Sequence, residues 1–226
     1  MTAIAKALSR ATDGLRGVSD TPRLDAELLM AEALHLDRDK LILSPPKRDV
    51  PNRFFEMLDR RKSGEPVAYI TGRRAFWNIE LHVGPGVLIP RPDSEVLIAS
   101  ALEHFGGTEG PKRILDLGTG PGTLLLAAID LWPGATGLGI DVSRQALSYA
   151  AANARRLGLE SRVKLKQGDW AKGIAERFDL ILCNPPYVAE DAKLGPGVRE
   201  YEPDEALFAG KEGLNAYREL APQLPA

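Results

Sequence analysis

The sequence RILDLGTGPG at residues 113–122 specifies the architecture of this 226-residue chain. Its first five residues form a short apolar run that is typical of a buried parallel strand, and the glycines after it predict a tight turn. A helix is predicted over residues 123–131, so its unpaired N–H groups lie behind that turn. The turn therefore predicts a ligand-binding loop, whose candidate contacts are Gly118, Thr119, Gly120, Pro121 and Gly122.

A second strand, residues 136–140, ends in Asp141, at the separation from the loop where a carboxylate accepts ribose hydroxyls. The loop reads G-x-G-x-G, whereas a dinucleotide site needs G-x-G-x-x-G to admit a pyrophosphate. This spacing favours a ligand without phosphates, such as S-adenosylmethionine. A third strand over residues 162–165 leads to Asp169 and Trp170, which are expected to hold the adenine amine and the adenine face.

The fourth strand, residues 178–183, ends at Asn184-Pro185-Pro186-Tyr187. Proline has no N–H and holds the residue before it extended, so this tetrapeptide presents the Asn184 side-chain oxygen and the Pro185 carbonyl as acceptors. Two fixed acceptors suit a substrate –NH2 group, with Tyr187 as a flat wall beside it. Four strands joined by crossover helices predict the sheet order 3-2-1-4, with their carboxyl ends at one cleft.

The residues before this sheet predict a small helical region and a connector. Helices are predicted at residues 22–34, 40–43 and 52–62, the last with Phe55 facing inward. Alternating apolar residues at 76–83, a turn at 84–86 and a returning strand at 87–89 predict a β-hairpin. A further helix, opened by residues 90–95, leads into the sheet.

The composition excludes several classes of function. The net charge is -2, so the chain lacks the basic field of a duplex-binding protein, and stable nucleic-acid binding is not expected. The single cysteine, Cys183, and three scattered histidines have no metal-ligand spacing, so no metal is expected. No apolar run approaches a membrane span and the N-terminus lacks a signal-peptide core, which predicts a cytoplasmic protein without a membrane partner.

Five motifs together resemble the HemK/PrmC family of glutamine methyltransferases, which act on peptide chain release factors. They are PVAYITG at 66–72, IPRPDSE at 89–95, DLGTG at 116–120, NPPY at 184–187 and YEP at 201–203. The resemblance implies an α/β fold with a class I (Rossmann-like) methyltransferase sheet, preceded by a small helical domain and a β-hairpin linker. It also implies S-adenosyl-L-methionine as cofactor, held by residues 118–122, Asp141, Trp170 and Asn184. The implied substrate is the glutamine of a Gly-Gly-Gln motif, bound by residues 184–187.

The same resemblance leads us to expect three parts. These are a helical substrate-docking domain at residues 1–72, a hairpin linker and lead-in helix at 73–110, and a methyltransferase domain at 111–226. The family continues with one further helix and three more strands, which these 226 residues do not include. The fourth strand is therefore expected to be an uncovered sheet edge, which favours aggregation.

The expected reaction is direct in-line methyl transfer to a side-chain amide nitrogen, with Asn184, Pro185 and Tyr187 as catalytic residues. One alternative is an adenine or guanine amine methyltransferase acting on nucleic acid, which shares the tetrapeptide. Another is a glutamine methyltransferase of a ribosomal protein. The glycine spacing disfavours a dehydrogenase, and a non-catalytic cofactor-binding module stays open.

Overall fold

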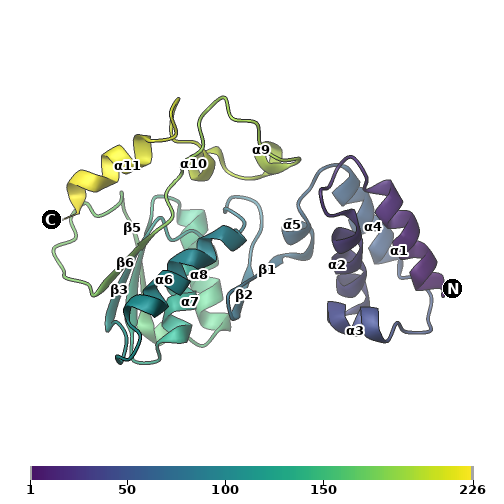
Figure 1. Ribbon diagram of the computed structural model, residues 1–226, viewed down its shortest axis with the longest axis horizontal. Helices are drawn as coiled ribbons and strands as arrows, with labels where there is room; N and C mark the ends of the chain where they lie inside the picture. Colours follow the sequence, from purple (N-terminus) through teal and green to yellow (C-terminus); the bar gives the residue numbers. More distant parts are fainter. Residues whose placement is uncertain (1, 225–226) are drawn as a thin grey trace. The chain divides into compact units, whose positions relative to one another are not determined.

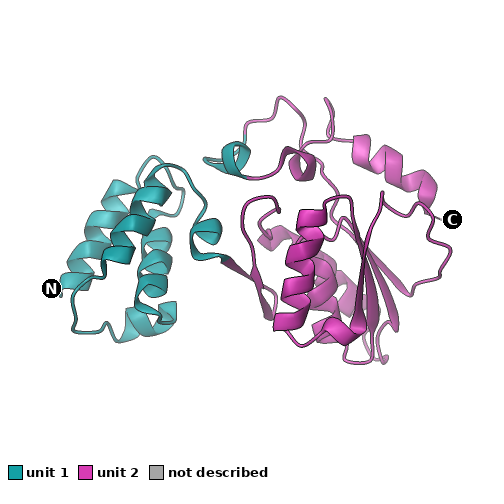
Figure 2. Ribbon diagram, turned by 180° about the vertical axis from the view of Figure 1, so that it is seen from behind, with its two compact units in different colours: residues 1–72, 194–201 teal, residues 73–193, 202–226 magenta. Residues whose placement is uncertain are grey.

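The computed structural model describes residues 2–224 of the chain. It divides into two compact units, one of residues 1–72 with 194–201 and the other of residues 73–193 with 202–226 (Figure 2). Residues 194–201 thus lie with the helical unit, whereas the sequence analysis assigned them to the C-terminal part. The other boundaries of the expected three-part division stay a prediction.

The first unit is built from helices. They are α1 (Ala3–Gly14), α2 (Pro22–Leu34), α3 (Arg38–Leu43), α4 (Asn52–Lys62), α5 (Val67–Thr71) and α9 (Val198–Tyr201) (Figure 1). Of these, α1 to α5 pack around one apolar core. Leu29 and Phe54 are completely buried in this core. Phe55, which the sequence analysis placed inward, is 47% exposed. The buried face of α4 consists of Phe54, Met57, Leu58 and Arg61, and Phe55 lies outside this face.

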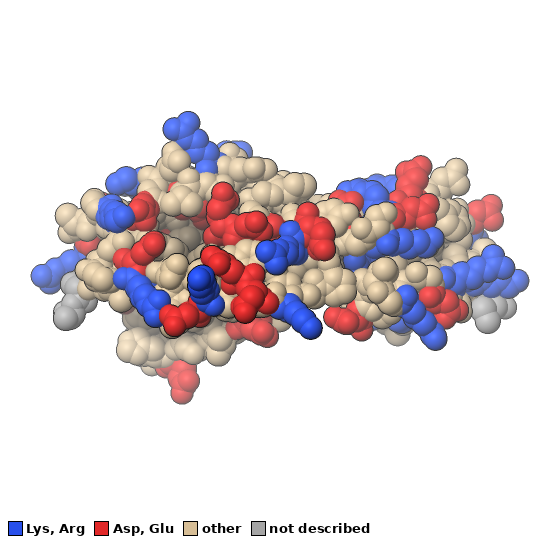
Figure 3. All heavy atoms as spheres, turned by 90° about the horizontal axis from the view of Figure 1, so that it is seen from above, with Lys and Arg blue, Asp and Glu red and all other residues tan. Residues whose placement is uncertain are grey.

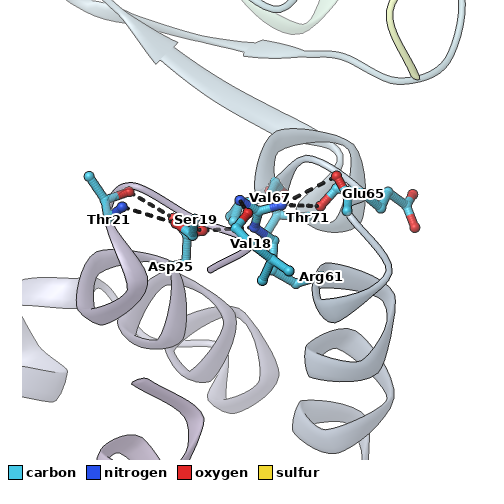
Figure 4. Close-up of polar contacts among 9 residues, drawn as sticks. Val18, Ser19, Thr21, Asp25, Arg61, Glu65, Val67 and Thr71 are labelled. Carbon is cyan, nitrogen blue, oxygen red and sulfur yellow. Dashed lines mark hydrogen bonds and ion pairs between the residues drawn. The ribbon is translucent and has the colours of Figure 1, made fainter. Parts of the chain in front are cut away.

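A buried ion pair joins α2 to the end of α4 (Figure 4). Arg61 Nε donates to Asp25 Oδ2 at 2.7 Å, and each side chain is 9% exposed. Their further hydrogen-bond partners are Val18, Ser19, Thr21, Gly64 and Glu65. Arg61 thus bonds to the loop after α4. The segment 194–201 contacts the same loop, because Tyr201 Oη donates to the Ser63 carbonyl at 3.2 Å.

The second unit is an α/β sheet preceded by a hairpin. Its elements are β1 (Arg73–Phe76), β2 (Ile79–His82), α6 (Glu95–His104), β3 (Arg113–Leu117), α7 (Thr123–Leu131), β4 (Thr136–Asp141), α8 (Arg144–Arg156), β5 (Val163–Gln167), β6 (Leu180–Cys183), α10 (Asp204–Leu207) and α11 (Asn215–Leu220). The four strands of the main sheet are parallel in the order β5-β4-β3-β6, which confirms the expected order 3-2-1-4. Within the described residues, β6 forms one edge of this sheet.

The two faces of the sheet are covered differently. On one face α7 lies so close that a Cβ added at Gly137 would be 2.5 Å from Leu125 Cδ1, so glycine permits this approach. On the other face Leu115 and Leu117 pack with Leu220 of α11. Successive side chains of a strand point to opposite faces, which places Asp116 on the α7 side.

The hairpin differs from the expected one. Its strands are β1 and β2, with Phe76 opposite Ile79, and its turn is Trp77-Asn78. Trp77 has a φ of 52°, which a bulky residue rarely adopts, so the sequence did not indicate a turn there. The turn expected at 84–86 is present, with the Val87 N–H donating to the Gly84 carbonyl at 3.4 Å, but the returning strand expected at 87–89 is wrong, because these residues have no strand pairing.

Charged side chains of both signs are interspersed over the face seen in Figure 3. The basic residues at the end of α4 have acidic partners, since Arg60 bonds Glu65 at 2.5 Å and Lys62 bonds Asp59 at 3.0 Å. These residues therefore form no field of a single sign. In the part of the chain that the structure describes, no helix has the length and apolar character needed to cross a membrane.

Candidate active site

A cavity of the second unit lies where the strands of the parallel sheet end, the usual ligand position in such folds. Of the residues expected at the site, those that line it are Gly118, Thr119, Gly120, Pro121, Asp141, Trp170, Asn184 and Pro186. The structure therefore brings together the ends of four strands, as the crossover topology requires.

The remaining expected residues do not line this cavity. Gly122 precedes the first residue of α7, and Asp169 pairs with Lys172 at the surface. Pro185 is buried, and Tyr187 is 55% exposed. The binding and catalytic roles expected of these four residues stay predictions.

The glycine loop is held by the end of β4. Gly118 and Thr119 each donate their N–H to the Ile140 carbonyl at 2.9 Å, and the Gly120 N–H donates to Asp141 Oδ2 at 2.8 Å. Gly120 has a φ of 57° and a Cβ there would meet nothing within 4 Å, so its backbone faces open space. A ligand can therefore approach the main chain at this point.

Asp141 bonds to this loop and can still accept further hydrogen bonds from a ligand. Its other oxygen, Oδ1, accepts the Ser143 N–H at 2.8 Å, which leaves further lone pairs on both oxygens. Burial raises the pKa of this carboxyl above its ordinary value, against the lowering effect of the Ser143 and Gly120 N–H groups. Ligand hydroxyls would add donors that favour the ionised form.

Asp116 is a site residue that the sequence analysis did not single out. Its Oδ2 accepts the Thr119 hydroxyl at 2.6 Å and the Leu125 N–H at 3.2 Å. Its Oδ1 is buried and has no hydrogen-bond partner among the described residues. Burial raises the pKa of this carboxyl to about 7. An acidic residue inside an apolar strand was the signal that could have identified it.

Ser94 is the second residue missed. The Asn184 side chain donates through Nδ2 to Ser94 Oγ at 3.0 Å, and both residues line the cavity. Asn184 Oδ1 accepts no hydrogen bond from any residue that the structure describes, so it is available to a ligand. Ser94 lies in the IPRPDSE motif, 90 residues before its partner, a distance that hides the contact from the sequence.

The rim of the cavity is fastened by Glu202. This buried side chain accepts the Ile89 N–H at 2.9 Å and the Arg91 guanidinium at 2.6 Å. Three of the residues that follow it, Pro203, Glu205 and Ala206, line the cavity, as Arg91 does. The YEP motif thus contributes a carboxylate that joins two distant segments of the rim.

The residues of this cavity fit S-adenosyl-L-methionine. The unpartnered Asp116 Oδ1 suits a cationic donor such as the amino group, and the free acceptor positions of Asp141 suit ribose hydroxyls. Trp170 lies beside Gly118 and offers an apolar wall for the adenine. When bound, this cofactor supplies a methyl group on a positively charged sulfur.

Two family models match the chain. Residues 6–72 match the PrmC N-terminal domain, and residues 109–211 match a methyltransferase domain. Among solved structures, the catalytic domain of hMettl16 in complex with the MAT2A 3′UTR hairpin 6 is similar with a TM-score of 0.53. It is 17% identical and covers 74% of this chain and 62% of that chain, which shows the fold alone.

Curated relatives of similar sequence carry the name release factor glutamine methyltransferase. The protein from Rhodospirillum rubrum is 44% identical over 212 residues, which are 92% of this chain and 65% of that protein. The protein from Caulobacter vibrioides is 40% identical over 98% of this chain and 78% of its own length. The chain thus spans about two thirds to three quarters of these relatives. It belongs to the family of release factor glutamine methyltransferases.

Proposed function

We propose that this chain transfers the methyl group of S-adenosyl-L-methionine to the side-chain amide nitrogen of a glutamine. The proposed substrate is the Gly-Gly-Gln motif of peptide chain release factors. The observation that carries the proposal is the hydrogen bond from Asn184 to Ser94, because it leaves Asn184 Oδ1 available in the cavity that the glycine loop also lines. Membership of the family supports the choice of protein substrate.

The chemistry follows from the weak nucleophilicity of an amide nitrogen, whose lone pair is delocalised into the carbonyl. Asn184 Oδ1 accepts one N–H of the substrate amide, turns its lone pair toward the methyl group and stabilises the positive charge that develops. The glutamine nitrogen then forms its bond to the methyl carbon as the bond from carbon to sulfur breaks. The methylated amide is acidic at that moment and loses its proton to water.

A translation factor as substrate implies that the enzyme works in the cytoplasm. The interspersed charges on the visible face in Figure 3 offer no basic track for phosphates, so stable nucleic-acid binding is not expected. Release factor is preferred over a ribosomal protein because of the family. One methyl-transfer assay can compare release factor, ribosomal protein and DNA as substrates.

The test is a labelled-methyl assay with Asn184→Ala and wild-type protein. Release factor, its Gln→Ala variant, a ribosomal protein fraction and DNA are offered separately. We expect label on release factor alone, and Asn184→Ala lowers the rate by about 10²–10³-fold because a transition-state acceptor is lost. Affinity for S-adenosylhomocysteine, measured by calorimetry, changes much less. Label on DNA, or on the Gln→Ala substrate, would overturn the proposal.

A further inference from the structure

The helix α8 presents a row of side chains to the segment that follows the hairpin. Gln145, Tyr149 and Asn153 are spaced four residues apart, so they share one face of the helix. Gln145 Nε2 donates to the Pro85 carbonyl at 2.7 Å, and a Cβ added at Gly84 would lie 2.4 Å from Tyr149 Oη. Asn153, at the far end of this row, has a different set of partners.

Asn153 is completely buried and hydrogen-bonded on both sides of its amide group. Its Oδ1 accepts the His82 N–H at 2.7 Å, and its Nδ2 donates to the His82 carbonyl at 3.0 Å. The same Nδ2 donates to the Pro121 carbonyl at 2.9 Å. Both N–H groups of the side chain are used, so the amide has one orientation and joins β2 to the glycine loop.

The hydrogen bond from Asn153 to Pro121 is one of several that hold the glycine loop. The other loop contacts come from the end of β4, from Asp116 of β3, which accepts the Thr119 hydroxyl, and from the loop itself, where Gly122 donates its N–H to the Thr119 carbonyl at 2.9 Å. Asn153 supplies the contact from α8 to the loop. Pro121 lines the cavity whereas Asn153 does not, so the side chain acts on the cavity from behind its wall.

The other backbone partner of Asn153, His82, precedes a segment that also lines the cavity. His82 is the last residue of β2, and the chain continues from it to Gly86, Arg91 and Ser94, which line the cavity. Ser94 in turn holds Asn184. One buried amide therefore fixes the glycine loop to the start of the segment that carries the contact to the catalytic asparagine.

We propose that Asn153 is a positioning residue for the cofactor site, acting through the Pro121 carbonyl and the backbone of His82. Its loss frees the loop on the α8 side, so that part of the binding free energy is spent on ordering the loop again. The inference rests on the proposed function only for its turnover readout. Cofactor binding tests it even if the protein substrate is a different one.

The test compares Asn153→Asp and Asn153→Ser with Gln145→Ala, which removes a contact of the same helix face that does not reach the loop. We expect the two Asn153 variants to bind S-adenosylhomocysteine about three- to tenfold more weakly by calorimetry, since one or two neutral hydrogen bonds are lost. Gln145→Ala keeps the wild-type affinity. In steady-state assays KM for the cofactor rises and kcat at saturation changes little.

A purely structural role would lower the melting temperature without changing the affinity of the folded fraction, and that result would overturn the proposal. A second measurement uses the wild-type protein, in case neither variant folds. Binding of S-adenosylhomocysteine should slow hydrogen exchange at the His82 amide, because this N–H donates to Asn153 Oδ1 and the same side chain donates to the Pro121 carbonyl of the loop. Unchanged exchange at this amide on binding would contradict the proposal equally.

Discussion

Each unit contains a buried aspartate, and these two aspartates have opposite surroundings. In the helical unit, buried Asp25 pairs with buried Arg61. Among the described residues, every side-chain nitrogen and oxygen of this pair has a hydrogen-bond partner. In the sheet unit, Asp116 is fully buried with no cation beside it and with one oxygen unpartnered among the residues described. Asp25 has a counter-charge within the fold, whereas Asp116, which lines the cavity, has an oxygen to which a ligand is expected to donate.

The largest effect is expected where the matched pair is broken. Asp25→Ala leaves the Arg61 guanidinium buried without a counter-charge, so we expect the free energy of unfolding of the helical unit to fall by about 3–5 kcal/mol. Urea denaturation measures it. The matched control is Asp13→Ala, since Asp13 pairs with Arg16 at the surface and its loss costs less than about 1 kcal/mol. Equal losses in the two variants would mean that burial does not distinguish the pairs.

The unmatched acid predicts a pH dependence of stability. Asp116 has a pKa of about 7 in the folded protein against an ordinary value of 3.8, so the folded state holds its proton more tightly. The stability from this proton is complete below pH 3.8 and is lost as the pH rises through about 7, a total of about 4 kcal/mol. Asp116→Asn cannot ionise and lacks this dependence.

The measurement is denaturation of both proteins without cofactor between pH 5 and pH 8. We expect the stability of wild type relative to Asp116→Asn to fall across this range, because only the wild-type carboxyl must ionise in a buried position. If the difference in free energy of unfolding between the two proteins stays constant, Asp116 is already ionised or solvated at pH 5. Asp116 would then not differ from Asp25 as an uncompensated buried acid.

Asp141 is expected to show a smaller effect, on ligand affinity. Asp141→Ala removes a charged acceptor for ribose hydroxyls and the partner of the Gly120 N–H, which costs about 1.5–3 kcal/mol, or roughly ten- to hundredfold in Kd. Calorimetry with S-adenosylhomocysteine measures this in protein shown to be folded. Glu176→Ala is the control, since Glu176 pairs with Arg113 at the surface and lies outside the cavity lining, so its loss should leave Kd unchanged. Equal affinities in all three proteins would remove Asp141 from the site.

The smallest effect concerns the orientation of Asn184. Ser94→Ala removes the hydroxyl that accepts from Asn184 Nδ2, so the amide can rotate, and we expect kcat to fall by about two- to tenfold. Ser94→Thr keeps the hydroxyl and should keep most of the activity. KM for the cofactor should be equal in all three proteins. A loss of activity in Ser94→Thr as large as in Ser94→Ala would assign Ser94 a packing role.

The active-site loop and the sheet were predictable because their signals are local. The apolar run at 113–117 and the glycines after it determine a strand and a turn, and the handedness of crossover connections then determines the strand order. The motifs at the ends of strands must consequently meet, which is why Asp141 and Asn184 were found from the sequence to belong to one cleft.

Only the tertiary structure decided which polar groups meet across long separations. Asp25 and Arg61 are 36 residues apart, Asn153 and His82 are 71 apart, and Glu202 and Arg91 are 111 apart. Sequence periodicity records which face of an element is apolar, but it carries no information on which distant polar group faces a given side chain. The hairpin turn at Trp77 was hidden for a related reason, because a bulky residue has a conformation that its own preference opposes and its N–H donates to Glu95 Oε1, 18 residues away, at 3.0 Å.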